Sequence, residues 1–410
     1  MKRKLVYDET EEENKRCKID LCTRGEAAFD FDPIHFLRCH SSNNDDADVK
    51  TQVWHCVFEP NNSDTVATCG GNSVCFINVE SGEVEGKYYS DKKDNFFTLS
   101  WTTISNLKCE ENILAVAGAS RYIHLLHPGK NVMFYKHTLS RDWKNVSSLL
   151  FHPLETNILF CSLSKGDVIV FDIGCPLPPQ YKTSFVKLYV LSAESEIFSL
   201  SFSLESNVLL AACNEGLRGW RIKSDDEMDT AQMLVFEHPS LQGQNSSQKG
   251  NQLVDSVEVL SNGFVATKCA LHGNIYVWNI RDTLKDIKNQ HTLKIAPSYV
   301  LKWKDTDNYF MYMGFNKDLL VCGDDKGALW IYNTRSFISE GDTPSKKKDV
   351  KPTLVLPWPD LLDTYCERRG KVRLDLFDIV VDKATVSGTG QYIVAVTSNN
   401  MVCVWKKVKV

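Results

Sequence analysis

The sequence predicts an all-β chain that folds as a seven-bladed β-propeller, with an N-terminal strand closing the last blade. Short runs rich in β-branched and aromatic residues recur along the 410 residues and end at turn residues. Seven of these runs end in an apolar residue followed by a polar one. Two-residue turns that end in glycine, typical of hairpins, lie between many neighbouring runs. A β-sandwich array or a two-domain chain is the alternative.

The first four units can be followed in order along the chain. Each unit contains three successive apolar runs, which we interpret as its first, second and third strands. These runs cover residues 52–60, 65–71 and 73–79; 95–102, 113–119 and 122–127; 146–153, 158–163 and 167–173; and 197–204, 208–213 and 217–222. The first unit also has a looser fourth run at 84–89.

The ends of the third runs fix the number of units. They are Ile77-Asn78, Leu126-His127, Phe171-Asp172, Trp220-Arg221, Trp278-Asn279, Tyr332-Asn333 and Trp405-Lys406. The first gaps are about 45–50 residues, close to the period of propeller blades. Later gaps are longer, and we assign the excess to polar surface loops at 225–228, 239–251, 339–351 and 363–373. The pattern therefore predicts seven blades.

Turn residues support this division. The pairs Gly70-Gly71, Lys165-Gly166, Glu215-Gly216, His272-Gly273 and Lys326-Gly327 each separate a second run from a third. Glycine adopts the positive φ of a tight hairpin turn without steric cost. We therefore expect a hairpin at each pair.

The last unit provides only three runs, at 376–381, 392–397 and 401–405. A propeller that did not close its ring would expose sheet edges. Residues 34–39 form an isolated apolar run without a partner of its own. We therefore predict that residues 34–39 supply the outer strand of the last blade.

The amino-acid composition argues against several classes of function. Lys and Arg total 47 and Asp and Glu total 52, a net charge of −5, which argues against a protein whose whole surface grips nucleic acid. Apolar runs fall short of the 18 residues of a membrane helix. The 14 cysteines form no C-x-x-C pair, and several lie inside apolar runs, which favours free buried thiols in a reducing compartment. We expect no cofactor, no metal, no membrane and no sequence-specific DNA binding.

The N-terminal 30 residues read as a disordered charged tail, followed by the propeller over 31–410. Two basic clusters resemble a bipartite nuclear import signal, in which each cluster occupies its own pocket of an importin groove. The clusters are Lys2, Arg3 and Lys4, then Lys15, Arg16 and Lys18. They predict importin as a partner and a nuclear, chromatin-associated location. A solvated tail without a signal is the alternative.

The units carry features of WD repeats, so the propeller is expected to be of the WD40 type. These features are Trp278-Asn279, Phe171-Asp172, Trp405 and the run Phe151-His152-Pro153. The Gly-His pair typical of such repeats is absent. The repeats are therefore divergent.

A more specific resemblance begins at DPIHFLRCHS (32–41) and continues at TQVW (51–54), FEP (58–60) and TVATCGG (65–71). These residues resemble the propeller of the family of leucine-rich repeat and WD repeat-containing protein 1, or origin recognition complex-associated protein. Residues 1–30 show no leucine-rich pattern. The resemblance implies a chromatin scaffold that binds origin recognition complex subunits and repressive methylated histone tails. It implies roles in replication initiation and heterochromatin organisation.

A more distant resemblance is to the polycomb WD protein EED, whose aromatic cage holds trimethyl-lysine. It implies cage positions at Trp54, Phe97 and Tyr312, with Met311 at a fourth position and Tyr309 and Phe310 nearby. A quaternary ammonium has no N–H to donate, so aromatic π-faces suit it. The alternative is that these rings only pack between blades.

No catalytic motif rises above chance, and we expect a protein that is not an enzyme. The sequence has no phosphate-binding glycine loop and no nucleophile elbow. A second binding role is docking to the adaptor of a cullin–RING ubiquitin ligase as a substrate receptor, through Trp278, Asn279 and Arg281. A third is a polycomb-type subunit of a histone methyltransferase complex.

Overall fold

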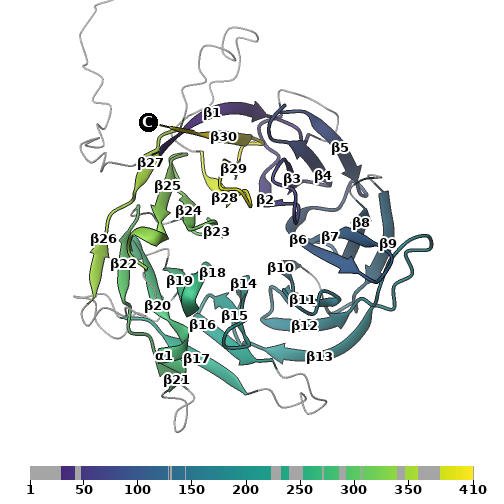
Figure 1. Ribbon diagram of the computed structural model, residues 1–410. Helices are drawn as coiled ribbons and strands as arrows, with labels where there is room; N and C mark the ends of the chain where they lie inside the picture. Colours follow the sequence, from purple (N-terminus) through teal and green to yellow (C-terminus); the bar gives the residue numbers. More distant parts are fainter. Residues whose placement is uncertain are drawn as a thin grey trace, which may run out of the picture.

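In the computed structural model, the described residues form seven mainly antiparallel sheets arranged in a ring around a central opening (Figure 1). The structure describes residues 29–41, 48–127, 129, 132–143, 145–222, 232–239, 253–269, 272–285, 292–304, 306, 308–338, 347–358 and 379–409. The candidate import signal at Lys2–Lys4 and Lys15–Lys18 lies outside the described residues. The seven-bladed propeller predicted from the sequence is confirmed.

The first three blades each contain four strands in chain order. The sequence predicted three strands in each and the fourth strand only in blade 1. Blade 1 comprises β2 (Val53–Phe58), β3 (Thr65–Gly70), β4 (Ser73–Asn78) and β5 (Val84–Tyr89). Blade 2 comprises β6 (Phe96–Ser105), β7 (Glu110–Gly118), β8 (Tyr122–His127) and β9 (Val132–Thr138). Blade 3 comprises β10 (Val146–Phe151), β11 (Ile158–Leu163), β12 (Asp167–Asp172) and β13 (Val186–Ser192).

Blades 4 and 5 each carry a fifth strand that joins the outer strand in parallel. Blade 4 comprises β14 (Ile197–Ser203), β15 (Val208–Cys213), β16 (Gly216–Arg221), β17 (Met233–Glu237) and the added β21 (Thr292–Lys294). Blade 5 comprises β18 (Ser256–Val259), β19 (Phe264–Cys269), β20 (Asn274–Asn279), β22 (Tyr299–Lys302) and the added β26 (Lys348–Val350). The prediction of a surface loop over 339–351 was therefore wrong at 348–350, where pairing with β22 satisfies the backbone.

Blade 7 closes the ring with the two ends of the described chain. Blade 6 comprises β23 (Gly314–Asn316), β24 (Leu319–Gly323), β25 (Leu329–Asn333) and β27 (Leu354–Leu356). Blade 7 comprises β28 (Val381–Val386), β29 (Tyr392–Thr397), β30 (Val402–Lys409) and β1 (Phe29–Leu37). β1 pairs antiparallel with β30 from Phe29 opposite Lys409 to Leu37 opposite Val402, which confirms the predicted closure (Figure 1).

One predicted strand of blade 7 is misplaced. The sequence pattern suggested a first strand at 376–381, but β28 begins at Val381. Residues 376–378 lie outside the described residues. The apolar residues of β28 alternate with the polar Asp382, Lys383 and Thr385, and this mixed pattern concealed the strand.

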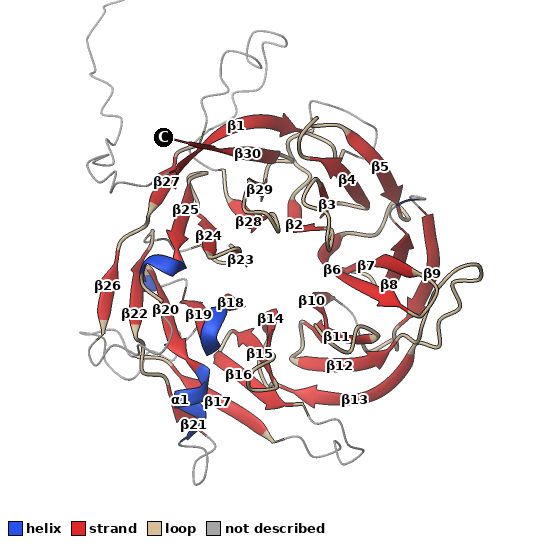
Figure 2. Cartoon of the chain, viewed as in Figure 1, coloured by secondary structure: helices blue, strands red, loops and turns tan. Residues whose placement is uncertain are grey.

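Short helical segments lie near blades 5 and 6 (Figure 2). They are α1 (Ile280–Leu284) and the 3-10 turns η4 (Ser261–Gly263) and η7 (Thr334–Ser336). Among the described residues, no helix is both long and apolar enough to span a membrane.

The hydrophobic core lies between neighbouring blades, because each sheet buries both of its faces. Every residue of β11 and β15 is buried, whereas the outer strand β13 is largely exposed. The largest fully buried side chains include Trp220, Trp278 and Trp405, each on the third strand of its blade. Cys56, Cys75, Cys161, Cys322 and Cys403 are buried, as their apolar neighbours in the sequence suggested.

The predicted hairpin turns are present between second and third strands. Gly166 and Gly216 have φ of 99° and 102°, in the region that favours glycine. A Cβ on Gly166 would lie 2.5 Å from the carbonyl oxygen of Ser195, just before blade 4. A larger residue at position 166 would therefore clash with the neighbouring backbone.

Candidate functional site at the channel rim

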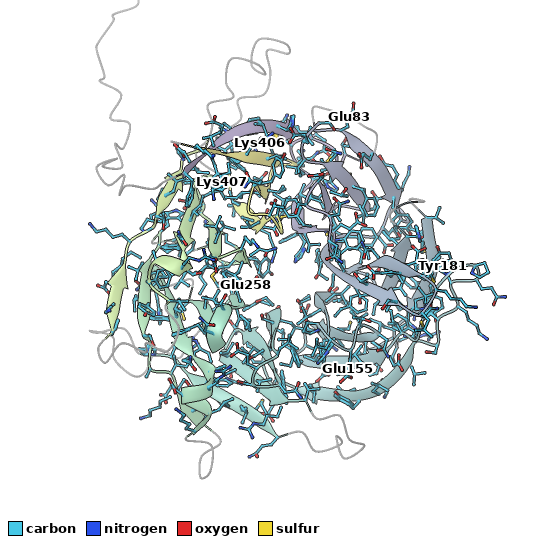
Figure 3. The ribbon with its side chains drawn as sticks, viewed as in Figure 1. Glu83, Glu155, Tyr181, Glu258, Lys406 and Lys407 are labelled. Carbon is cyan, nitrogen blue, oxygen red and sulfur yellow. The ribbon has the colours of Figure 1, made fainter. Side chains whose placement is uncertain are left out.

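The central channel contains a cavity of about 610 Å³, lined mainly by the first strands of blades 1 to 5 and by Tyr312 and Lys383. Glu258, on β18, lies at the inner edge of the ring (Figure 3). Because first strands from several blades line this cavity, residues far apart in the sequence come together at its rim.

A repeated backbone irregularity sets the direction of the rim side chains. In five blades the pairing of the first and second strands shifts by one residue at the second position of the first strand. A bulge of this kind leaves one residue out of the ladder and re-aims its side chain. The residues at these positions are Trp54, Phe97, Ser147, Phe198 and Asp382.

Two of the predicted cage residues are in contact. The rings of Trp54 and Phe97, from blades 1 and 2, meet edge to face with centroids 5.3 Å apart and planes at 73°. Both side chains are half-buried, so each ring keeps a surface for a ligand. The indole N–H of Trp54 is buried and has no hydrogen-bond acceptor among the described residues. Two rings set nearly at right angles are suited to form adjoining walls of a cage.

Tyr312 reaches the same rim from blade 6. Its backbone N–H donates to the carbonyl oxygen of Asp382 at 2.7 Å, and Phe97 and Tyr312 both line the cavity. The Gln52 amide, two residues before Trp54, donates to Asp382 Oδ1 at 2.7 Å. Tyr312, Asp382, Trp54 and Phe97 therefore follow one another on blades 6, 7, 1 and 2.

Three carboxyl groups lie near Tyr312. Burial raises the pKa of Tyr312, and the negative charges of Asp255, Asp382 and Glu196 raise it further. Burial also raises the pKa of Asp382 well above its usual range, against the hydrogen bond from Gln52. A cation bound beside Asp382 would favour the ionised form of this carboxyl group.

Met311 does not face the rim. Its side chain is fully buried in the core shared by blades 5 and 6, so it is not available as a cage wall in this structure. The adjacent residues differ: Tyr309 is 44% exposed, and Phe310 is half-buried with φ of 68°.

The sequence reasoning missed Phe198, the bulged residue of blade 4. Its ring meets that of Phe310 edge to face with centroids 5.2 Å apart, and Tyr312 packs on the same cluster. Phe97, Tyr312 and Phe198 all line the channel cavity, and Tyr312 packs with Phe198 and Phe310 in a second aromatic cluster. The signal that could have revealed Phe198 is its position, equivalent to Trp54 and Phe97 at the second residue of a first strand.

A charged pair, Lys383 and Glu258, lines the same cavity. Lys383 Nζ lies 3.7 Å from Glu258 Oε1 and donates to the Met313 carbonyl oxygen at 3.1 Å. Burial raises the pKa of Glu258, and the charge of Lys383 opposes this. Burial and the charge of Lys383 lower the pKa of His55 well below its usual value.

The three residues of the candidate adaptor-docking motif have different structural roles. Trp278 is fully buried, and Asn279 accepts hydrogen bonds from the backbone N–H groups of Arg281 and Asp282 at the start of α1. The Arg281 guanidinium pairs with Glu205, and its side chain is 57% exposed. Of the three, Arg281 alone presents a side chain on which an adaptor could act.

The structure is a propeller with an aromatic rim. Comparison with known proteins identifies the family of the chain. Residues 21–408 match the family model of leucine-rich repeat and WD repeat-containing protein 1, WD domain. The chain belongs to this family.

Curated relatives share the family name. The chain is 31% identical over 391 residues to leucine-rich repeat and WD repeat-containing protein 1 of Xenopus laevis, covering 92% of this chain and 53% of the relative. It is 32% identical to that of Danio rerio and 28% identical to that of Homo sapiens, again over 92% of this chain. It covers 50% and 58% of these two relatives. The chain thus spans about half the length of the curated relatives that it matches.

Similar solved structures support the fold. A chain in the crystal structure of the Chaetomium thermophilum polycomb repressive complex 2 superposes with a TM-score of 0.67. The match has 11% sequence identity and covers 92% of this chain and 97% of that chain. A chain of an active polycomb repressive complex 2 in the basal state gives a TM-score of 0.66 at 10% identity, covering 92% and 97%. At these identities the likeness concerns the fold.

Proposed function

We propose that this chain is a non-enzymatic chromatin scaffold whose channel rim binds methylated lysine of histone tails. The arrangement of Trp54, Phe97 and Tyr312 on one rim, with Asp382 between blades 6 and 1, carries the proposal. Aromatic faces and a carboxyl group together suit a cation that has no hydrogen to donate. Family membership and the WD-repeat propeller fold agree with a scaffold.

The expected affinity follows from the number of rings. Each well-placed ring contributes about 0.5–2 kcal/mol, so three rings contribute roughly 2–6 kcal/mol. Micromolar binding requires about 8 kcal/mol. The cage therefore selects methylated over unmodified lysine, and contacts to the peptide backbone supply the remainder. The unpaired indole N–H of Trp54 is one donor that a peptide carbonyl could satisfy.

The test compares peptides and variants by isothermal titration. We expect histone peptides with trimethylated lysine to bind, with the unmethylated peptides roughly tenfold weaker or worse. Trp54→Ala should lower the affinity for the methylated peptide by about 1–2 kcal/mol. Tyr89→Ala is the matched control, since Tyr89 is an exposed aromatic residue beside Lys87 on the outer strand of blade 1. Equal binding of methylated and unmethylated peptides would reject the cage.

We further propose origin recognition complex subunits as partners and the nucleus as the location, with importin recognising the basic N-terminal clusters. The family name and the residues at 32–71 that resemble the origin recognition complex-associated protein support this part. Affinity purification from nuclear extract should recover origin recognition subunits with the wild-type chain. Recovery of a ubiquitin ligase adaptor without these subunits would instead favour the substrate-receptor alternative.

A further inference from the structure

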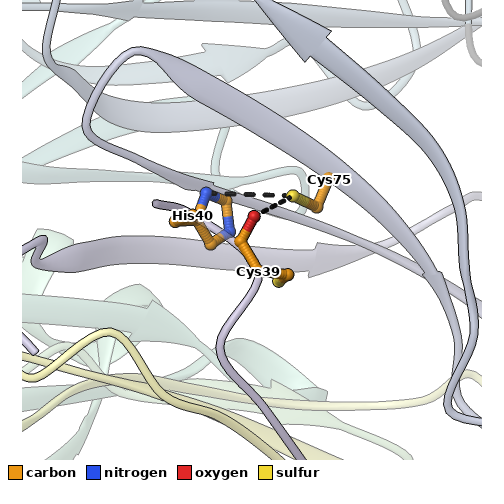
Figure 4. Close-up of side chains that lie close together, drawn as sticks. All are labelled: Cys39, His40 and Cys75. Carbon is orange, nitrogen blue, oxygen red and sulfur yellow. Dashed lines mark hydrogen bonds between the residues drawn. The ribbon is translucent and has the colours of Figure 1, made fainter. Parts of the chain in front are cut away.

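A cluster of soft metal ligands lies at the junction of blades 7 and 1, away from the aromatic rim. Cys39 and His40 follow the closing strand β1, and Cys75 lies on β4, the third strand of blade 1 (Figure 4). The two Sγ atoms and one ring nitrogen all lie within 4.8 Å of one another. No other group of three or more such ligands occurs among the described residues.

The spacing of the ligand atoms is close to that of a zinc site. Cys75 Sγ lies 4.0 Å from His40 Nδ1 and 3.3 Å from the Cys39 carbonyl oxygen. In a tetrahedral zinc site, bonds of about 2.3 Å to sulfur and about 2.0–2.1 Å to nitrogen place neighbouring ligand atoms roughly 3.5–3.8 Å apart. A contraction of a few tenths of an ångström would bring the Cys75–His40 pair into this range.

The surroundings of His40 orient its ring. His40 Nε2 lies 2.8 Å from Thr68 Oγ1, and Nδ1 lies 2.9 Å from Ser73 Oγ. If Nε2 carries the proton, it donates to Thr68, and Nδ1 keeps a lone pair, with Ser73 Oγ at 2.9 Å and Cys75 Sγ at 4.0 Å. Zinc bound to Nδ1 would replace the contact with Ser73. A hydrogen bond from the second ring nitrogen is the usual way in which proteins fix a metal-binding histidine.

Burial and charge suit a dication with two thiolates. His40 is 1% exposed and Cys75 is fully buried, while Cys39 is half-buried and offers an entry path. Binding of Zn²⁺ would displace one proton from each thiol, and two thiolates with a neutral imidazole would leave the buried complex without net charge. Three protein ligands leave the fourth tetrahedral position to water or to a ligand from a partner.

We propose that Cys39, His40 and Cys75 form a zinc site that fastens the ring closure. The metal would join the segment that leaves blade 7 to the third strand of blade 1, so that opening β1 requires loss of the metal or of its ligands. Metal binding that requires the folded state adds its free energy to folding. This inference is independent of the proposed histone recognition.

The purified full chain, treated with chelator and dialysed against zinc, should retain one zinc per chain by mass spectrometry of metal content. Cobalt(II) should give thiolate-to-metal charge-transfer absorption and the intense visible bands of tetrahedral cobalt. Zinc should raise the Tm of the wild-type chain. The paired substitution Cys39→Ser with Cys75→Ser should remove the one zinc and the Tm response.

Cys109→Ser is the matched control, because Cys109 is a half-buried free thiol on the approach to β7. It should keep the full zinc content and the Tm response. The cobalt spectrum of the wild-type chain tests the site even if the paired variant does not fold. Absence of zinc and of the thiolate–cobalt band would overturn the proposal, as would an intact mass showing a Cys39–Cys75 disulfide in place of two thiols. Equal zinc content in the paired variant and the wild type would also overturn it.

Discussion

Two junctions between blades use the same histidine contact with different surroundings. At the junction of blades 7 and 1, His40 Nε2 lies 2.8 Å from Thr68 Oγ1; at that of blades 4 and 5, His238 Nε2 lies 2.8 Å from Thr267 Oγ1. Each histidine follows an outer strand, and each threonine lies on the second strand of the next blade. The structural histidine therefore persists although the Gly-His pair is absent from the sequence.

The third strands distinguish the two junctions. In blade 5, Trp278 Nε1 approaches Thr267 Oγ1 at 3.3 Å, whereas the equivalent position in blade 1 is Ile77. Blade 5 also buries the ion pair of Lys268 and Asp255, with Nζ and Oδ2 2.6 Å apart. Around His40, two thiols, Cys39 and Cys75, lie near the ring in addition to the hydroxyls of Thr68 and Ser73. The same histidine–threonine hydrogen bond thus lies beside a buried tryptophan at the junction of blades 4 and 5. At the junction of blades 7 and 1 it lies beside potential metal ligands.

The largest expected effect is the loss of Trp278. Trp278→Ala should lower the free energy of unfolding by about 3–5 kcal/mol, because it removes a fully buried ring and a donor near Thr267. Ile77→Ala at the matched position should cost less, near the lower part of the roughly 2–5 kcal/mol range for such truncations. Urea denaturation of both variants measures the difference. A smaller loss for Trp278→Ala than for Ile77→Ala would contradict the assigned roles.

The second prediction concerns the loss of folding stability at low pH through His238. Burial, with the charge of His272, lowers the pKa of His238 to about 3. An unfolded histidine binds a proton below about pH 6.5, while folded His238 stays neutral until about pH 3. Its contribution to stability is therefore complete above about pH 6.5 and is lost as the pH falls toward 3, by on the order of 1 kcal/mol per pH unit.

His238→Gln should remove this part of the acid sensitivity. Denaturation curves recorded near pH 7 and near pH 5 should show a smaller drop for the variant than for the wild type, whatever its stability at the higher pH. The comparison of the two drops cancels the contribution of other titrating groups. Parallel curves for variant and wild type would mean that His238 is not held neutral by burial.

The third prediction separates the two threonines. Thr68→Val and Thr267→Val each remove a buried hydroxyl partner of a histidine and should each cost about 1–2 kcal/mol of stability. If the zinc site is present, Thr68→Val should also weaken zinc binding by roughly 10–100-fold, while Thr267→Val leaves it unchanged. Competition with a colorimetric chelator measures both affinities. Equal zinc affinities for the two variants would remove Thr68 from the site.

The smallest expected effect is at Arg281, on the surface near the second junction. Its ion pair with Glu205 is largely exposed, so Arg281→Ala should change the free energy of unfolding by less than about 1 kcal/mol. The same variant tests adaptor docking. Pull-down of a ligase adaptor by the wild type but not by Arg281→Ala would revive that alternative; recovery by neither chain would remove it.

The ring was predictable because its signals are local. Third-strand ends such as Phe171-Asp172, and turn glycines such as Gly166, mark each blade within a few residues. The closing strand was found from a global requirement, since the last unit lacked an outer strand and one apolar run had no partner. The added strands β21 and β26 escaped detection because three-residue strands within polar segments have no distinctive pattern.

The candidate sites were less predictable because they depend on registers and on distant parts of the chain. Trp54, Phe97 and Tyr312 were reached by resemblance, but Phe198 needed the bulge that the strands share. Met311 and Tyr312 are adjacent, and the sequence could not show which of them faces the core. Cys75 is far in sequence from Cys39 and His40, and no metal-binding spacing signalled their approach.

We propose that the rim of blades 6, 7, 1 and 2 holds a methylated lysine. A crystal structure of the chain with a trimethyl-lysine histone peptide tests it directly. We expect the ammonium nitrogen to lie within about 6 Å of the ring centroids of Trp54 and Phe97, with Tyr312 as a further wall. A peptide seated elsewhere, with Trp54 and Phe97 still packed only against each other, would contradict it.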